Sequence, residues 1–335
     1  MSAADAERAL LLRLHAGPAS GDDLARDSGQ TRAAVWKRIE ALRAAGVAID
    51  AAPGRGYALA GPLDLLDAAT IRAALSDGTR AGLAELDVAW SLPSTNTALL
   101  DAAAPAAGTA VLLAERQTGG RGRRGREWAS PLAANLYLSL SRRFDGGLAR
   151  LGGLSLVAGI AAAEALQSLG AHDVRLKWPN DLVVADGNGL RKLGGLLVEG
   201  GGEHAGPVRA VVGLGLNVRM PSATAARIDQ PWTDLDALLG AALPARSRIA
   251  AALMDALLPA FDAFDAHGLA PFLRRHAALD ALAGRAVVVH GARANDQGVA
   301  LGLAADGALR VRLDEGSERS FHAGEVSVRA AAARA

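Results

Sequence analysis

The sequence contains no cysteine, only 4% aromatic residues, and very little lysine or asparagine. The absence of cysteine excludes disulfides, thiolate metal sites, cysteine nucleophiles and iron–sulfur clusters. Lysine occurs three times, at Lys37, Lys177 and Lys192, whereas the other 33 basic residues are arginine; asparagine occurs six times. Arginine cannot replace the compact ammonium group of lysine. The positions that keep lysine or asparagine in this Ala-, Gly- and Arg-rich chain are therefore candidate functional sites.

Charge and hydropathy narrow the class of protein further. The chain has 335 residues and a formal net charge of +1, which gives length for about two to three domains and argues against coating of nucleic acid. The apolar stretch 151–163 ends at Glu164 and is too short to cross a bilayer, so it predicts a buried helix. The N-terminus carries acidic residues before its apolar run and does not resemble a signal peptide. We therefore expect a cytoplasmic protein without a membrane partner.

Residues 1–62 predict a winged helix-turn-helix domain. Leucines at helical spacing predict a first helix that stops at Gly17, and a short second helix follows. Thr31 is expected to cap a third helix, which ends at Gly46. Two short strands within 47–59 complete the pattern as a β-ribbon, the wing of such a domain.

The third helix of this domain is the element expected to bind DNA. It carries four basic residues and one acid: Arg32, Lys37, Arg38 and Arg43 against Glu40. With Arg55 at the tip of the wing, the predicted DNA-binding residues are Arg32, Lys37, Arg38 and Arg55. The alternative is a winged helix that serves only packing or dimerisation. Because the domain as a whole is not strongly basic, one copy should bind weakly and a dimer is expected for useful affinity.

The rest of the chain predicts an α+β fold with two further domains. Residues 63–282 alternate helices with strands and predict a mixed α/β domain on a mostly antiparallel sheet. Strands are expected at 88–91, 110–115, 135–142, 174–177, 182–184, 193–199 and 208–217. Helices are expected at 68–75, 96–103, 151–169, 235–239 and 248–267. Residues 283–329 contain short strands separated by turn sequences and predict a small SH3-like β-barrel.

Residues 116–126 form the most basic segment of the chain. They hold five arginines, four glycines and no acid, and they follow a predicted strand. So concentrated a positive charge is costly to order, so we expect disorder until a phosphate-bearing ligand binds. Gly120, Gly122 and Gly125 match G-x-G-x-x-G, but a strand follows, and Asp145, the nearest candidate for the acid about 20 residues on, comes after two arginines. We therefore reject a dinucleotide-binding fold. A flexible surface loop and an RNA-binding loop remain as alternatives.

Four further segments place polar or small residues at the ends of strands and helices. KWPND, at 177–181, joins two strands, and Lys192 opens another strand after a Gly-rich turn. PSTN, at 93–96, starts a helix, and the stretch from Gly213 to Asn217 ends a strand with small residues that let a ligand approach the backbone. Each segment alone has an ordinary structural explanation. Together they predict a site for an anion and a carboxylate-bearing small molecule.

Several long segments resemble, in the right order, those of the biotin protein ligase family. AERQTGGRGRRGREWASPLAANLYLSL resembles its adenylate-binding segment, KWPNDL and RKLGGLLVE its next two motifs, GLGLNV the following strand, and PSTN its first biotin-contacting segment. GEVSVR resembles the end of the family's small barrel. TRAAVWKRIEALRAAGV with PGRGYAL resembles the winged helix of the bifunctional members, which also repress the biotin operon. The similarity covers nearly the whole chain.

The resemblance implies an activity and its catalytic residues. The family activates biotin with ATP to give biotinyl-5′-adenylate and pyrophosphate, and it then transfers biotin to a lysine of a carboxyl carrier domain of a carboxylase. Lys192 is expected to contact the oxygens on which charge develops, and Arg123 to close over the phosphate. Asp181 is expected to orient or deprotonate the incoming lysine. Mg²⁺ is implied as a cofactor beside Lys177, Asn180 or Asp181.

The resemblance also assigns the ligand-binding residues by motif. The biotin head group is assigned to Ser94, Thr95, Asn96 and Gln117. The segment that closes over biotin and the adenylate is assigned to Arg121, Gly122 and Arg123, with Arg126 near the nucleotide phosphates. The nucleotide side is assigned to Lys177, Asn180 and Lys192, with Trp128 on the adenine. Glu325 and Arg329 belong to the barrel motif that the family brings near the nucleotide.

The resemblance further implies operator DNA as a partner and a homodimer when the adenylate is bound. Two alternatives remain: a biotin ligase whose winged helix does not regulate, and a lipoate-type acyl ligase or non-catalytic sensor on the same fold. The combination of the Arg/Gly segment with KWPND and RKLGG disfavours the second alternative. Segment 183–190 is a few residues longer than the family pattern, so the loop before Lys192 is expected to differ in shape.

Overall fold

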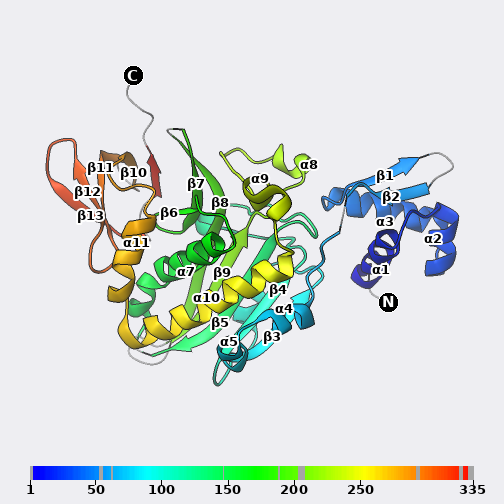
Figure 1. The fold of residues 1–335 in the computed structure, drawn as a ribbon, viewed down its shortest axis with the longest axis horizontal. Helices are drawn as coiled ribbons and strands as arrows, with labels where there is room; N and C mark the ends of the chain where they lie inside the picture. Colours follow the sequence, from blue (N-terminus) through cyan, green and yellow to red (C-terminus); the bar gives the residue numbers. More distant parts are fainter. Residues whose placement is uncertain are drawn as a thin grey trace.

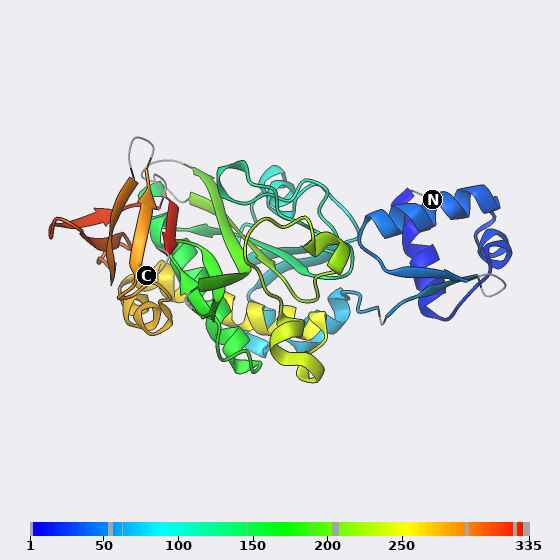
Figure 2. The same ribbon diagram turned by 90° about the horizontal axis from the view of Figure 1, so that it is seen from above.

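A computed structural model describes residues 3–52, 56–61, 63–145, 147–187, 189–202, 208–291, 295–323 and 327–330. Figures 1 and 2 show three parts in a row, with the N-terminal helices at one end, a large sheet with helices in the middle, and a small sheet at the other end. The order of the parts is the predicted one. Residues 62 and 283 remain our proposed domain boundaries.

The N-terminal part is a winged helix-turn-helix, as predicted. It consists of α1 (Ala3–His15), α2 (Gly21–Ser28), α3 (Arg32–Ala44), β1 (Ile49–Ala52) and β2 (Gly56–Leu59). Thr31 caps α3 through its side chain, which accepts a hydrogen bond from the amide of Ala34. The first wing strand begins later than expected, because Gly46 adopts a φ of 101° and Val47 still bonds back to α3.

The central part is built on a seven-stranded, mostly antiparallel sheet. Its strands are β3 (Leu83–Ala89), β4 (Thr109–Ala114), β5 (Leu136–Phe144), β6 (Arg175–Lys177), β7 (Asp181–Asp186), β8 (Gly189–Gly202) and β9 (Val208–Leu216). Their order across the sheet is β3-β4-β5-β9-β8-β7-β6, and β3 with β4 is the parallel pair. The prediction of a mixed domain on a mostly antiparallel sheet is confirmed.

Helices cover the sheet and link its strands (Figure 1). They are α4 (Ala68–Ala74), α5 (Asp77–Ala81), α6 (Thr95–Asp101), α7 (Leu154–Ser168), α8 (Ser222–Ala225), α9 (Leu235–Leu239), α10 (Arg246–His267) and α11 (Leu273–Leu279). The stretch Leu151–Ser168 is apolar and long enough for a membrane span, but 67% of it is buried inside the protein. It packs against α10 and the sheet, which confirms the predicted core helix. The short α5, α8 and α11 were not predicted, because they have no clear apolar period.

The C-terminal part is a small antiparallel sheet with the strand order β13-β12-β11-β10-β14. Its strands are β10 (Ala286–His290), β11 (Asn295–Leu303), β12 (Leu309–Leu313), β13 (Glu318–Phe321) and β14 (Ser327–Ala330). Its apolar core includes Leu156 and Trp178 of the central part. The indole of Trp178 also donates a hydrogen bond to the carbonyl of Gly307, at 3.0 Å. These contacts dock the small sheet directly behind the KWPND segment.

A buried ion pair connects the linker after the winged helix to the central sheet. Arg246, at the start of α10, is 2% exposed, and its guanidinium lies 2.7 Å from the carboxylate of Glu115. The same guanidinium donates to the carbonyls of Asp64 and Asn135, and Glu115 accepts the amide of Leu66. Burial raises the pKa of Glu115, and the cation of Arg246 opposes this rise. The charges are therefore stable only as a pair.

Arg246→Met should lower the free energy of unfolding by about 3–5 kcal/mol, because it leaves the carboxylate of Glu115 buried without its partner. Urea unfolding followed by tryptophan fluorescence measures this. Arg219→Met is the matched control, since Arg219 pairs with Asp236 while both side chains are about half exposed. It should cost about 1 kcal/mol or less. Equal effects of the two substitutions would contradict a structural role for the buried pair.

Stability should also fall in mild acid because of His276 on α11, which is 1% exposed. Burial lowers the pKa of His276 below its ordinary 6.5, although Asp280 partly opposes this shift. The unfolded chain takes up a proton that the folded ring resists, so this stability is complete above pH 6.5 and is lost as pH falls through the lowered pKa. His276→Gln should flatten the unfolding free energy between pH 7.5 and 5.5, whereas His15→Gln at an exposed site should not. An unchanged slope would refute this.

Candidate active site

A buried polar cluster forms where α6 begins. Ser94 caps the helix, and Thr95 donates both its amide and its hydroxyl to Oε1 of Gln117, at 2.8 and 3.0 Å. Ser139 on β5 donates to Oδ1 of Asn96 at 2.6 Å, and its hydroxyl lies 2.7 Å from that of Thr95. The structure thus brings together Ser94, Thr95, Asn96 and Gln117, the four residues predicted to bind one ligand head group. Ser139 was missed, although a lone serine between leucines in LYLSL was its sequence signal.

Two neighbours on β8 that the sequence did not predict hold Asn96 over the sheet. Its amide nitrogen donates to Oε2 of Glu199 at 2.8 Å and to the carbonyl of Leu197 at 3.2 Å. A methyl group on Gly213 would overlap the Asn96 amide. Asn96 therefore lies directly against the backbone of Gly213, and a ligand contact at Gly213 stays a prediction. Glu199, on β8, was not predicted at all.

The Arg/Gly segment follows a defined path in the structure. A backbone bridge joins Arg121 to Glu127, and the amide of Gly122 donates to the carbonyl of Arg126 at 2.7 Å. Arg121 also pairs with Glu199 at 3.1 Å, beside the polar cluster. We expected this segment to order only around an anion. Its dependence on an anion stays a prediction, and the exposed side chain of Arg126 remains available to one.

Arg123, also in this segment, is half-buried and contacts two other parts of the protein. Its guanidinium donates to Oδ1 of Asn180 at 3.2 Å and to the carbonyl of Ala323 in the C-terminal sheet. Burial and the neighbouring Arg124 lower the pKa of Arg123, while Asp181 opposes the shift. Arg123 therefore joins the Arg/Gly segment, the KWPND segment and the C-terminal part at one point.

A second cluster of charges lies at the far side of the site. Nζ of Lys192 is 2.7 Å from Oδ1 of Asp181, and Nζ of Lys177 is 3.7 Å from Oδ2 of the same carboxylate. The register of β7 against β8 shifts here, so that Leu193 is an extra residue opposite Leu182 and Val183. Such a bulge bends a strand and redirects a side chain. It accounts for the inward direction of Lys192 at the start of a long strand.

Trp128 lies between the two clusters. A methyl group on Gly215 would overlap its indole, and the Gly195 backbone lies beneath its edge. Nζ of Lys192 is 5.4 Å from the centre of the ring, a cation–π distance. The indole N–H is buried without a hydrogen-bond partner in the described structure. We expected Trp128 on the adenine; the geometry places it on a glycine floor along the line from Asn96 to Lys192.

Two of the predicted binding asparagines use their amides within the protein. Asn180 donates to the carbonyl of Leu196 at 2.7 Å, and Asn217 donates to the carbonyl of Thr233 at 3.0 Å. Asn217 is only 4% exposed. Its buried amide holds segment 231–233 beside the backbone of Lys192. Asn217 thus positions segment 231–233, and its direct contact with a ligand stays a prediction.

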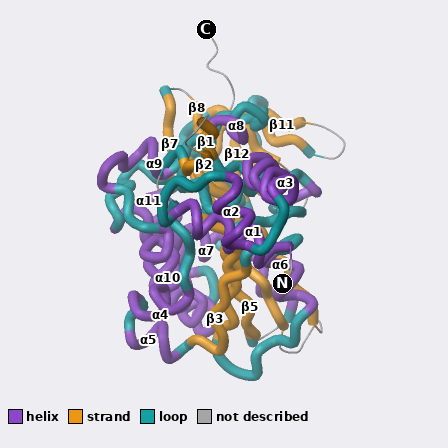
Figure 3. The backbone as a smooth tube through the Cα atoms, turned by 90° about the vertical axis from the view of Figure 1, so that its right-hand side faces the viewer, coloured by secondary structure: helices purple, strands orange, loops and turns teal. Residues whose placement is uncertain are grey.

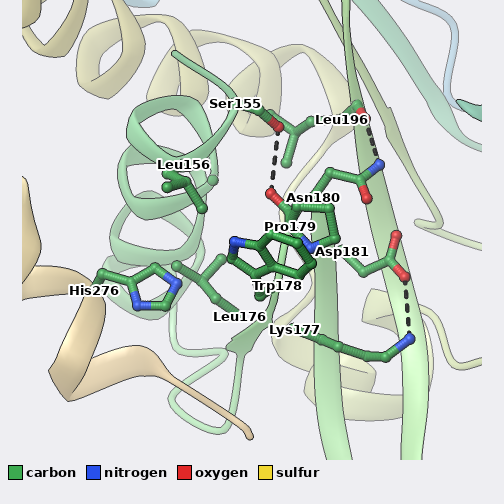
Figure 4. A pocket seen from close by; sticks show the side chains of 11 residues that line it. Ser155, Leu156, Leu176, Lys177, Trp178, Pro179, Asn180, Asp181, Leu196 and His276 are labelled. Atoms are coloured by element: carbon green, nitrogen blue, oxygen red, sulfur yellow. Dashed lines mark hydrogen bonds and ion pairs between the residues drawn. The ribbon is translucent and has the colours of Figure 1, made fainter. Parts of the chain in front are cut away.

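The alternation of side chains along KWPND explains how one segment serves two sides (Figure 4). Lys177 and Asp181 point together toward the charge cluster, whereas Trp178 points toward the C-terminal core. Behind the segment lies a small pocket whose walls include Ser155 of α7 and His276 of α11. Residues 177–181 form one wall of this pocket, so the pocket adjoins the charge cluster of Lys177 and Asp181.

The predicted DNA-binding residues divide into two groups. Arg32 and Lys37 are exposed on α3. Arg38 is half-buried and donates to Oε1 of Gln30 at 2.8 Å, so its guanidinium is held against its own domain. The described residues do not include Arg55 and Glu325, nor the side chain of Arg329.

Three family models match this chain in the predicted order. The Biotin/lipoate A/B protein ligase family matches residues 88–217, an HTH domain matches 7–58, and the Biotin protein ligase C terminal domain matches 284–329. The first covers the polar cluster, the Arg/Gly segment and both lysine motifs. The matches agree with the three structural parts.

Similar proteins give the same result over nearly the full length. The chain is 40% identical over 312 residues to the Bifunctional ligase/repressor BirA of Salmonella typhimurium and to that of Escherichia coli, with 93% of each chain covered. A solved biotin protein ligase from Aquifex aeolicus, in complex with biotin and ATP, has a TM-score of 0.60 at 24% identity, covering 74% of this chain and 100% of its own. That likeness supports the fold alone. Through its sequence relatives, the chain belongs to the biotin protein ligases, and within them to the bifunctional ligase/repressors.

Proposed function

We propose that this protein joins biotin to ATP to form biotinyl-5′-adenylate, and then transfers biotin to a lysine of a biotin carboxyl carrier domain of a carboxylase. The observation that carries this proposal is a row of groups that begins at Asn96 over Gly213, passes the indole of Trp128 over Gly215, and ends at Lys192. It has hydrogen-bonding groups at one end, a flat apolar wall in the middle, and cations at the other. A cytoplasmic location, where ATP is available, is part of the proposal.

The two ends of the row from Asn96 to Lys192 match the two ends of biotin. Its ureido ring has two N–H donors and one carbonyl acceptor, and the cluster at α6 offers hydroxyl and amide groups of both kinds. Gly213 and Gly215 are two residues apart on one strand face, about 6–7 Å. An aliphatic chain that runs this way lies beside Trp128 and brings its carboxylate toward Lys192. A lipoyl ring has no N–H donor, so the polar cluster disfavours the lipoate alternative.

The first step joins the biotin carboxylate to the α-phosphorus of ATP. A carboxylate oxygen attacks phosphorus, the bond from phosphorus to the bridging oxygen breaks, and pyrophosphate leaves with the electron pair. Charge develops on the phosphoryl oxygens, where Lys192 and Arg123 stabilise it. Asp181 holds the ammonium group of Lys192 at this end of the row through its 2.7 Å ion pair. Arg121 and Arg126 extend the cationic surface around the phosphates.

The second step needs no nucleophile from the enzyme, because the mixed anhydride is already activated. The amine of the carrier lysine attacks the acyl carbon, the amide bond forms, and AMP leaves. A neutral amine is required, and Asp181 is the proposed group to orient it or accept its proton.

The described residues contain no cluster of three His, Asp or Glu side chains that could hold a metal ion. Mg²⁺ in nucleotide sites is commonly held by substrate phosphates with one or two carboxylates. The carboxylate of Asp181 already lies between two lysines, which fits a resident cation poorly. We therefore infer that Mg²⁺ enters with ATP, and no step is assigned to it.

We also propose that the adenylate-bound protein dimerises and binds operator DNA as a repressor. Arg32 and Lys37 lie exposed on α3, where they can reach the duplex. A dimer would supply the second half-site contact that a domain of modest charge needs. A ligase with a non-regulatory winged helix is the remaining alternative. Binding to the DNA upstream of the protein's own biotin genes, with and without adenylate, separates the two.

Lys192→Ala should slow adenylate formation by about 100- to 1,000-fold, because the removed cation acts where charge develops. Pyrophosphate release from ATP and biotin measures this step, and transfer to an apo carrier domain measures the second. Arg310→Ala removes an exposed cation in the C-terminal sheet and should leave both steps unchanged. A near-normal rate for Lys192→Ala would remove Lys192 from the chemistry.

Gly213→Ala should raise KM for biotin by about tenfold with a smaller effect on kcat, because the added methyl group displaces Asn96 from the head-group cluster. Gly201→Ala, on β8, is the control, since a Cβ there meets no atom within 4 Å. Initial rates at varied biotin give both constants. If Gly213→Ala leaves KM at the control value, Asn96 does not hold the head group.

A further inference from the structure

The recognition helix carries an apolar side chain that its own domain does not cover. Trp36 on α3 is 55% exposed, and the other exposed large hydrophobic residues in the described structure are Leu12 at 42% and Val299 at 38%. The remaining large apolar residues of α3 are buried in the domain core. Figure 3 views the molecule from the end that carries the winged helix-turn-helix, and α3 lies at this surface.

The surroundings of Trp36 are basic and otherwise small. The exposed stripe of α3 consists of Arg32, Ala33, Trp36, Lys37, Ala41 and Ala44. Its two charged members are both cations, and Glu40, one turn after Trp36, is paired with Arg43 at 2.8 Å. Lys37 makes no ion pair within the described part of the chain, and Arg32 has only a loose pair at 3.3 Å with Asp22, in which both side chains are mostly exposed. The alanines allow a partner to approach the helix backbone closely.

These features fit a DNA groove better than a protein partner. A protein interface would surround the indole with further apolar groups, whereas here cations flank it. Trp36 is the fifth residue of α3, and helical side chains lean toward the N-terminus, where recognition helices meet base edges. An indole offers an apolar face for the thymine methyl group and one N–H donor for acceptors in the major groove.

We propose that Trp36 is a specificity-determining residue that contacts thymine methyl groups in the major groove, while Arg32 and Lys37 bind the flanking phosphates. This inference rests on the proposed repressor function and adds to it the way in which one part of the sequence is read. The lysine sets affinity for any duplex, and the tryptophan sets preference among duplexes.

The test uses the full-length protein with biotin and ATP. A duplex enriched by selection from a random pool is compared with a scrambled duplex, and with the selected duplex in which deoxyuridine replaces thymidine. Trp36→Ala should bind the selected duplex about tenfold more weakly, a loss typical of one base-pair contact, but the scrambled duplex equally well. Loss of the methyl groups should weaken the wild type and not Trp36→Ala.

Two further variants and the ligase reaction serve as controls. Leu12→Ala removes another exposed apolar residue and should change neither affinity. Lys37→Gln should weaken both duplexes and lower the slope of affinity against salt by about one. Adenylate formation by Trp36→Ala should remain at the wild-type rate, which shows that the chain is folded.

The outcomes separate the residue from the function. If the wild type enriches no sequence, the repressor function fails and this inference fails with it. If the wild type is selective and Trp36→Ala keeps its preference or its methyl dependence, the repressor function stands and the role of Trp36 is refuted. Loss of self-association in Trp36→Ala, with unchanged DNA preference in the remaining dimer, would assign the indole to a protein contact and also refute the proposal.

Discussion

The buried ion pair of Glu115 and Arg246 is the constraint on which the site depends. Glu115 directly follows β4, and its carbonyl accepts the amide of Ala133, so both ends of the intervening loop are attached at one point. That loop contains Gln117, the Arg/Gly segment and Trp128. Without a fixed base, the 17 residues 116–132, four of them glycine, could not place an indole and a guanidinium accurately. A buried pair is a costly anchor, but it holds the linker, the loop and α10 together.

Glycine in this site makes room for side chains of the protein. Gly213 accommodates Asn96, and Gly215 accommodates Trp128. Glycine in a strand interior weakens the strand, but β9 is central in the sheet and has a hydrogen-bonded neighbour on each side, which offsets this loss. The polar cluster and Trp128 can therefore lie close to the backbone of β9. Asn96 and Trp128 thus form one layer of side chains that packs on the glycines of β9.

Local signals predicted much of this molecule, and long-range contacts account for the rest. The sequence predicted the cap at Thr31, the apolar stripe on α3 and the apolar helix α7, because each depends on neighbours within a few turns. Glu199 was not, since a carboxylate at the end of an apolar strand carries no sign that Asn96 and Arg121 lie beside it. The contacts of Arg38 with Gln30 and of Asn217 with Thr233 were not predicted for the same reason: composition shows which groups these residues offer, but not which groups of the fold use them.

A short stretch of chain connects the winged helix-turn-helix to the segment that carries Trp128. Leu132 is 3% exposed and belongs to the apolar core of the winged helix, although it lies only four residues after Trp128. Its amide donates to the carbonyl of Ala45 just beyond α3, at 2.8 Å. The segment that carries Trp128 thus also contributes to the apolar core of the domain that carries the recognition helix. Leu132 therefore joins the segment that carries Trp128 to the C-terminal end of α3 through one apolar core and one backbone hydrogen bond. Because packed cores have few voids, the position of this segment depends on the position of α3.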